Sequence, residues 1–167
     1  MHASSTSGDA AERGGRWVAA QFVLIALVLL AAFLPPGWPG ALELPLAAFG
    51  AACSLLGLLL AFWGWRGLGR AATPFPRPRE DGRLVESGPY AYVRHPIYSG
   101  GLLFLGGLAL ATSPGALVPL ALLAVLWRNK AALEEELLAE RYGEYAEYRE
   151  EVRGAFVPRP TSARRAG

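Results

Sequence analysis

Long apolar runs constrain this sequence more than any other feature. Hydrophobic residues make up 53% of its 167 residues, and they are grouped in blocks. The runs Trp17–Leu34 and Leu44–Trp65 are each long enough to cross a bilayer as a helix. A secretory signal peptide has a shorter apolar core, so we interpret the first run as a retained transmembrane helix, with a signal sequence as the alternative.

Two further apolar runs follow, at 97–111 and 116–127, with the turn Thr112–Gly115 between them. A helix of about 15 residues rises only ~23 Å, against a hydrocarbon core of ~30 Å. We therefore predict a helical hairpin whose ends extend into polar sequence, with a re-entrant hairpin as the alternative. The segment 66–96 between the second and third runs is rich in arginine and proline, which predicts an extended loop.

Small residues recur in the second run. Gly50 and Ser54, then Gly57 and Ala61, lie four positions apart. This spacing brings them to one face of a helix and predicts close approach of a neighbouring helix.

The last part of the chain is charged and periodic. Apolar side chains recur at helical spacing from Leu138 to Phe156, and Glu136, Glu140 and Glu147 fall on the opposite face. We predict an all-α fold: a polytopic helical membrane protein with about four transmembrane helices and a C-terminal amphipathic cytoplasmic helix. We expect disordered tails at 1–16 and 159–167 and a single membrane domain at 17–158. Within this domain, the expected spans are 17–34, 44–65, 97–112 and 115–128, and the expected C-terminal helix is 129–153.

Charge predicts the sidedness of these helices. With four spans, all 16 lysine and arginine residues lie on one side of the membrane, because the loop 35–41 and the turn 112–115 contain none. The positive-inside rule then places both termini and the loop 66–96 in the cytoplasm.

Composition also argues against some classes of function. A net charge of +2 is too small to indicate nucleic-acid binding, and no basic helix carries interleaved aromatic residues. The single cysteine, Cys53, lies in an apolar run without neighbouring metal ligands, so we expect a buried packing residue and no metal site. No protein partner is evident, and the expected partner is the lipid bilayer.

The segment 83–101 joins a polar, arginine-bearing stretch to the third apolar run. Pro96 suits the first turn of a helix, which puts His95 at or near its N-cap. A helix N-terminus attracts carboxylates or phosphates, and tyrosines offer aromatic faces and hydroxyls. Taken singly, such residues are typical membrane anchors. Together they predict a site for a ligand with an anionic end and an aromatic base. The polar members of this junction are Tyr90, Tyr92, Arg94, His95 and Tyr98.

The acidic run Glu134–Glu136 adds a second signal. At ~100° per residue, Glu134 lies about 40° from Leu138 and Glu135 about 60°, while Glu136 points away. A carboxylate beside an apolar face needs a partner, which would be Lys130 or the cation of a ligand. A solvated helix start is the alternative.

At these residues the sequence resembles the isoprenylcysteine carboxyl methyltransferase and phospholipid methyltransferase family of integral membrane enzymes. The matching pieces are LVESGPYAYVRHPIYSG and EEELLAERYGEYAEYREEV followed by Pro158, and the match runs from residue 83 to about 158. The resemblance implies S-adenosylmethionine as methyl donor, bound where the cytosol meets the membrane, and a lipophilic or small methyl acceptor. No glycine-rich dinucleotide fingerprint follows a predicted strand, so the soluble methyltransferase fold is not expected.

Carried over by position, the resemblance implies a set of site residues. The family's arginine for the substrate carboxylate falls on Lys130 here, and lysine keeps the charge but loses bidentate geometry. Glu134 would close the site, and Glu134 or His95 would accept a proton from an amine acceptor. The implied cofactor-binding residues are Arg83, Leu84, Val85, Tyr90, His95, Pro96, Ile97, Tyr98 and Glu134.

Two other functions fit the same pattern. A membrane reductase would bind a nicotinamide nucleotide at the same face. A non-catalytic membrane assembly or stress protein would bind no nucleotide, and its junction would serve only as an anchor.

Overall fold

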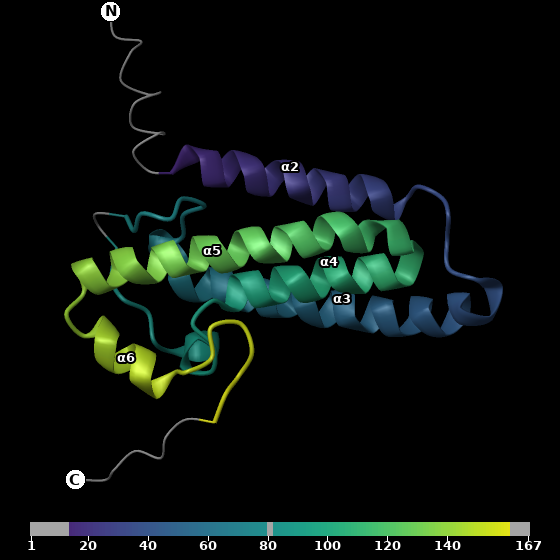
Figure 1. Ribbon diagram of the computed structural model, residues 1–167. Coiled ribbons are helices and arrows are strands. Elements are labelled where there is room, and N and C mark those ends of the chain that lie inside the picture. Colours follow the sequence, from purple (N-terminus) through teal and green to yellow (C-terminus); the bar gives the residue numbers. More distant parts are fainter. Residues whose placement is uncertain (1–13, 80–81, 161–167) are drawn as a thin grey trace, which may run out of the picture.

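The computed structural model describes residues 14–79 and 82–160, and every regular element in those ranges is helical. The long helices lie side by side (Figure 1). Both predicted tails fall mainly outside the described residues, which end at Pro160. The first helix begins at Gly15, two residues before its predicted start. The long helices are α2 (Gly15–Ala32), α3 (Gly40–Leu68), α4 (Pro96–Thr112) and α5 (Leu117–Arg141). The shorter elements are α6 (Tyr145–Glu151) and the 3₁₀ turns η1 (Gly69–Ala71), η2 (Gly88–Ala91) and η3 (Pro114–Ala116).

Three helical segments are long and apolar enough to cross a membrane. They are Gly15–Ala32, Gly40–Ala71 and Pro114–Arg141. Helix α4 is apolar but has 17 residues, which rise about 26 Å. The chain is therefore an integral membrane protein of the polytopic helical class that the sequence predicts.

Helices α3 and α4 pack against each other more closely than any other pair. A Cβ added to Gly57 would collide with the backbone of Gly100 and Phe104, and one added to Gly107 would lie 2.5 Å from the carbonyl oxygen of Gly50. The predicted close approach at Gly50 and Gly57 is therefore confirmed. Absence of side chains at these positions lets the two backbones touch.

Helix α2 packs on the other side of the bundle, against α5 and α4. Val28 of α2, Leu105 of α4 and Leu123 of α5 are buried together in one apolar core. The outward faces of α2 and α3 expose large apolar side chains such as Phe22, Leu56 and Phe62. In a membrane protein these faces contact lipid.

The prediction of a separate helix over 129–153 is wrong. Helix α5 begins in the fourth apolar run and continues without interruption to Arg141. The chain then leaves the helical conformation at Tyr142, and α6 follows as a separate short helix from Tyr145. The expected extension of the hairpin into polar sequence is confirmed, because the charged run 128–141 is the last part of α5.

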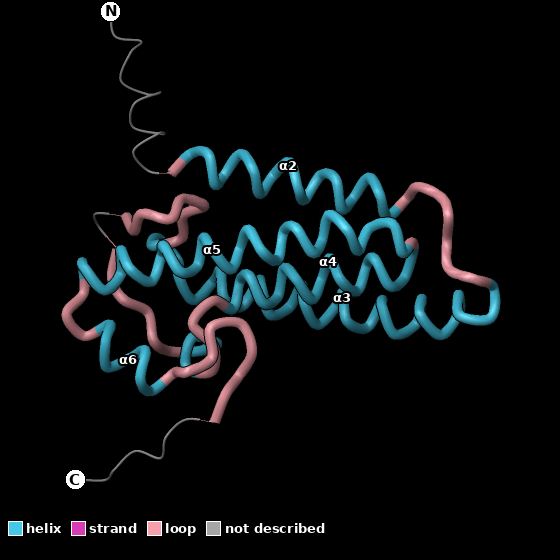
Figure 2. The backbone as a smooth tube through the Cα atoms, viewed as in Figure 1, coloured by secondary structure: helices cyan, strands magenta, loops and turns pink. Residues whose placement is uncertain are grey.

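The polar segments gather at one end of the bundle. The start of α2, the end of α3, the start of α4 and the end of α5 meet there, together with α6 (Figures 1 and 2). The region 66–96, predicted to be an extended loop, holds the end of α3 and the turns η1 and η2. Every candidate site residue from the sequence therefore comes to the same end.

Candidate functional site

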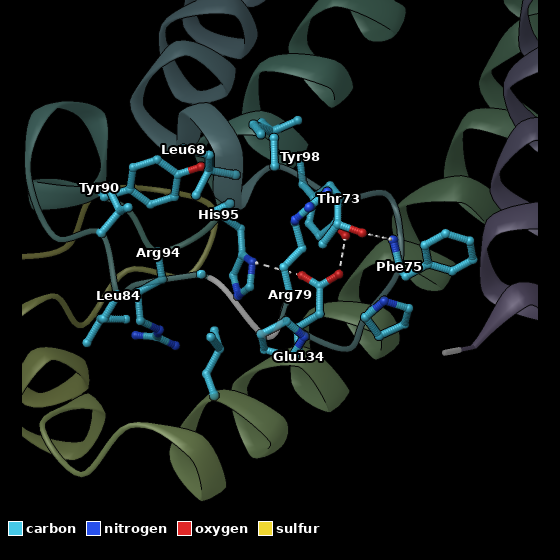
Figure 3. Close-up of a pocket in the computed structure, with 18 of the residues that line it drawn as sticks. Leu68, Thr73, Phe75, Arg79, Leu84, Tyr90, Arg94, His95, Tyr98 and Glu134 are labelled. Atoms are coloured by element: carbon cyan, nitrogen blue, oxygen red, sulfur yellow. Dashed lines mark hydrogen bonds and ion pairs between the residues drawn. The ribbon is translucent and has the colours of Figure 1, made fainter. Parts of the chain in front are cut away.

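A cavity of about 460 Å³ lies at this end of the bundle. Its wall is built from α2, α3, residues within 71–79 and 82–85, α4, α5 and the C-terminal tyrosines. Figure 3 shows Tyr90, His95, Tyr98 and Glu134 around it. This volume falls within the range of about 300–1,000 Å³ that is usual for small-molecule sites.

The start of α4 forms one wall of the cavity. His95 is the N-cap residue and Pro96 takes the first helical position, as the sequence predicts. The backbone N–H groups of Arg94 and His95 donate to the carbonyl oxygens of Gly154 and Ala155. The C-terminal segment therefore holds the entry to α4, and these two N–H groups are not available to an anion.

Glu134 lies opposite this helix start, on α5. The Tyr98 hydroxyl donates to Oε1 of Glu134 at 2.5 Å, and His95 Nδ1 lies 3.6 Å from Oε2. Lys130 Nζ is 3.8 Å from Oε1 of the same carboxylate. The predicted i,i+4 partner of Glu134 is thus present, and the carboxylate is also joined to α4.

The neighbouring Glu135 makes a different set of contacts. Its Oε1 accepts from Nε of Arg94 at 2.9 Å, and its Oε2 accepts from Nη2 of the same guanidinium at 3.2 Å. His95 Nε2 lies 3.1 Å from Glu135 Oε1. Arg94 also donates to the carbonyl oxygen of Val152 at 2.7 Å. The Arg94 guanidinium is therefore engaged by protein acceptors, although Arg94 also lines the cavity.

Both ring nitrogens of His95 therefore face a carboxylate, from two consecutive residues of α5. The ring is 7% exposed. It also packs beside two aromatic rings, with centroid distances of 5.6 Å to Tyr98 and 5.7 Å to Phe156, and these two rings lie 6.2 Å from each other. Tyr98 stacks in turn on Trp127 at 5.1 Å. Packing in this aromatic cluster and contacts at both nitrogens fix the orientation of this imidazole.

Tyrosines form the wall away from the membrane. The hydroxyl of Tyr148 donates to the carbonyl oxygen of Tyr90, and that of Tyr142 donates to the carbonyl oxygen of Gly82. The Tyr145 hydroxyl is buried and has no hydrogen-bond partner. Burial raises the pKa of Tyr90, Tyr145 and Tyr148 well above the usual range for a phenol. These phenols stay neutral at physiological pH.

The cavity brings together all but one of the cofactor-binding residues expected from the sequence. Pro96 is the exception, since it is buried at the start of α4 and packs near Gly64. Lys130, expected at the substrate, also lines the cavity, with a side chain that is 1% exposed. The expected residues on the cavity wall are Arg83, Leu84, Val85, Tyr90, His95, Ile97, Tyr98 and Glu134.

Some cavity residues were missed by sequence reasoning. Gln21 of α2 accepts hydrogen bonds from Lys130 and from Trp127, and Pro74 accepts one from Lys130. In the sequence, Gln21 is a single amide within an apolar run, and such a polar residue in a membrane helix indicates a functional position. Pro74 carried no such signal, because its contact is made by a backbone carbonyl.

Fold and site together define a class of protein: a helical integral membrane protein with an ionisable, aromatic-lined cavity at one end of its bundle. Comparison with known proteins is more specific. Residues 46–145, more than half of the chain, match the family model described as phospholipid methyltransferase. The chain therefore belongs to the phospholipid methyltransferase family. The resemblance found in the sequence is therefore confirmed.

One curated relative is also similar. The chain is 32% identical over 150 residues to the cobalt-zinc-cadmium resistance protein CzcN of Cupriavidus metallidurans. The alignment covers 88% of this chain and 64% of that protein, so the chain spans less than two thirds of its relative.

Proposed function

We propose that this protein transfers a methyl group from S-adenosylmethionine to a lipophilic or small acceptor at the cytoplasmic end of its helix bundle. The observation that carries this proposal is the contact between Glu134 and His95 on the wall of a 460 Å³ cavity. The two residues come from the two motifs that mark the family. The family match alone does not locate the reaction in the molecule, whereas the contact between these two residues suggests where it occurs.

The residues on the cavity wall suit such a cofactor. The Glu134 carboxylate would accept hydrogen bonds from the ammonium or ribose of the donor. The N–H groups of Ile97 and Tyr98 have no acceptor among the described residues, and they would serve the carboxylate of the methionine portion. Tyr90 would pack against the adenine ring, while Arg83, Leu84 and Val85 would contact the same ligand from the loop.

When bound, S-adenosylmethionine supplies a methyl group already activated by its sulfonium centre. The protein therefore needs mainly to align the acceptor and to exclude water. The stacked rings of Trp127, Tyr98 and His95 would form an apolar wall for this purpose. Lys130 would bind an anionic group of the acceptor, as the charge of its ammonium favours.

Proton handling depends on the acceptor. A carboxylate acceptor needs no general base. An amine acceptor must release a proton, and Glu134 or His95 would take it, since both line the cavity and contact each other.

Radiolabelled methyl transfer into a lipid extract tests the proposed reaction. The wild type should label a lipid fraction, and Glu134→Gln should not. Thermal protection separates the alternatives: S-adenosylhomocysteine should raise the melting temperature of the purified protein, and NADPH should leave it unchanged. Protection by NADPH alone would favour the reductase, and protection by neither would favour a non-catalytic protein.

The cytoplasmic placement of the site rests on the distribution of basic residues. A reporter active only in the cytoplasm, fused after the C-terminus, should be active. Activity of a reporter that works only outside the cytoplasm would contradict this orientation.

A further inference from the structure

Gln21 is a polar side chain in a helix that otherwise faces lipid and the apolar core. It lies within α2, is 7% exposed, and lines the cavity. It also precedes residues 46–145, the part of the chain that matches the family model. A buried polar group inside a membrane helix costs free energy unless it has partners, which makes it a candidate functional residue.

The contacts of Gln21 fix which way its amide group points. Its Oε1 accepts from Lys130 Nζ at 2.8 Å and from Trp127 Nε1 at 3.3 Å. An ammonium and an indole N–H can only donate, so the amide must present its oxygen to them. The amide NH₂ group then points away from both residues.

The NH₂ group has no protein acceptor in the described part of the chain. Within residues 14–79 and 82–160, the Tyr145 hydroxyl is the one fully buried side-chain polar atom without a hydrogen bond. The Gln21 nitrogen is therefore not sealed inside the protein. Gln21 is among the residues that line the cavity, so its amide can reach a ligand held there.

Lys130 occupies the same end of the cavity. Besides Gln21, its ammonium donates to the carbonyl oxygen of Pro74 at 2.6 Å and lies 3.8 Å from Glu134. Gln21 and Pro74 thus hold the cation in place beside the Glu134 carboxylate. An amide NH₂ group next to this ammonium adds a hydrogen-bond donor to that corner of the cavity.

We propose that Gln21 determines acceptor specificity: it positions Lys130 and donates an amide N–H to an anionic oxygen, carboxylate or phosphate, of the methyl acceptor. The proposal rests on the proposed function and adds to the family's matched region a residue from helix α2. In this proposal Gln21 binds the acceptor and not the methyl donor, so its loss should change acceptor use and leave donor binding intact.

Two variants separate the positioning of Lys130 from the donation of a hydrogen bond to the acceptor. Gln21→Leu removes both the oxygen and the NH₂ group. Gln21→Glu keeps oxygens for Lys130 and Trp127 but replaces the N–H donors with an anion, so it retains the bridge between α2 and α5. Ser54→Ala is the matched control, because it removes another polar helix contact, to the carbonyl oxygen of Phe104, away from the cavity.

The assay uses the full chain in phosphatidylcholine vesicles that carry either oleic acid or dioleoylphosphatidylethanolamine, with radiolabelled S-adenosylmethionine. Both Gln21 variants should raise the apparent KM for the labelled lipid by about tenfold or more, the loss expected for a hydrogen bond to a charged group. The Kd for S-adenosylhomocysteine should change less than twofold in Gln21→Glu. Ser54→Ala should resemble the wild type.

An unchanged acceptor KM in both variants overturns the role of Gln21 and leaves the proposed function standing. A wild type that binds S-adenosylhomocysteine but labels neither lipid overturns the assignment of an anionic-oxygen acceptor. A wild type that binds no S-adenosylhomocysteine contradicts the proposed function itself. Labelling of only one lipid identifies whether carboxylate or phosphate is recognised.

Discussion

Nδ1 of His95 lies 3.6 Å from Oε2 of Glu134, although the two residues belong to different helices. His95 caps the start of α4, and Glu134 lies in the last third of α5. The same histidine contacts Glu135 through its other ring nitrogen. One side chain therefore ties the start of one helix to two consecutive carboxylates of another, and this arrangement defines the site.

Replacing His95 with alanine should abolish binding of S-adenosylhomocysteine. The substitution removes the ring that contacts both Glu134 and Glu135 and packs against Tyr98 and Phe156. Calorimetric titration of the purified protein measures the affinity. Tyr92→Ala is the control, since Tyr92 is in the same segment but exposed, and it should bind normally. Unchanged affinity in His95→Ala would refute the placement of the cofactor.

Replacing Glu135 with alanine should destabilise the protein. It leaves the Arg94 guanidinium, whose side chain is 11% exposed, without its carboxylate partner. Loss of one member of a largely buried ion pair costs about 3 kcal/mol. Thermal unfolding in detergent should show a lower melting temperature than for Glu140→Ala, which removes an exposed carboxylate of the same helix. Equal melting temperatures would show that the pair contributes little.

Replacing Gly57 with alanine should weaken the packing of α3 on α4. The new methyl group would collide with backbone atoms of α4, and overpacking of this kind costs about 2 kcal/mol. Gly40→Ala in the same helix has nothing within 4 Å of the added carbon and should behave as the wild type. If both variants unfold at the wild-type temperature, the backbones of α3 and α4 are not in close contact at Gly57.

High pH should destabilise the folded protein. Burial raises the pKa of Tyr90, Tyr145 and Tyr148 above the value of about 10 that phenols have when unfolded. A raised folded-state pKa gives stability that is present below pH 10 and lost as the pH rises toward the folded value. The melting temperature should therefore fall above about pH 10.

Tyr145→Phe tests this source of alkaline sensitivity. The Tyr145 hydroxyl has no hydrogen-bond partner, so its removal should not lower stability at neutral pH. The variant should lose less stability than the wild type above pH 10. A pH profile identical to that of the wild type would assign the alkaline loss to other groups.

Local patterns predicted the helices and much of the site. Pro96 marks the start of α4, and Glu134 faces the cavity as predicted because α5 stays regular through that residue. Glu136 is exposed, as the same argument requires. The glycine after Tyr142 is a common signal for a helix end, and it marks where the predicted helix 129–153 is interrupted.

Local sequence patterns could not predict the contacts between distant segments. Gln21 and Lys130 are 109 positions apart, and no periodicity relates them. The pairing of Arg94 with Glu135 depends on how α4 and the C-terminal segment dock on α5, which the sequence does not state. The relative placement of helices, set by the glycine contacts between α3 and α4, decides which polar groups meet.

The affinity of S-adenosylhomocysteine for the wild type and for Glu134→Gln, measured side by side by calorimetry, tests the central claim most directly. Glu136→Gln is the control, because Glu136 lies two residues further along the same helix, is exposed and does not line the cavity. We predict saturable binding to the wild type and to Glu136→Gln, and no measurable binding to Glu134→Gln. Equal affinity in all three proteins would contradict a site formed between the start of α4 and the Glu134 carboxylate.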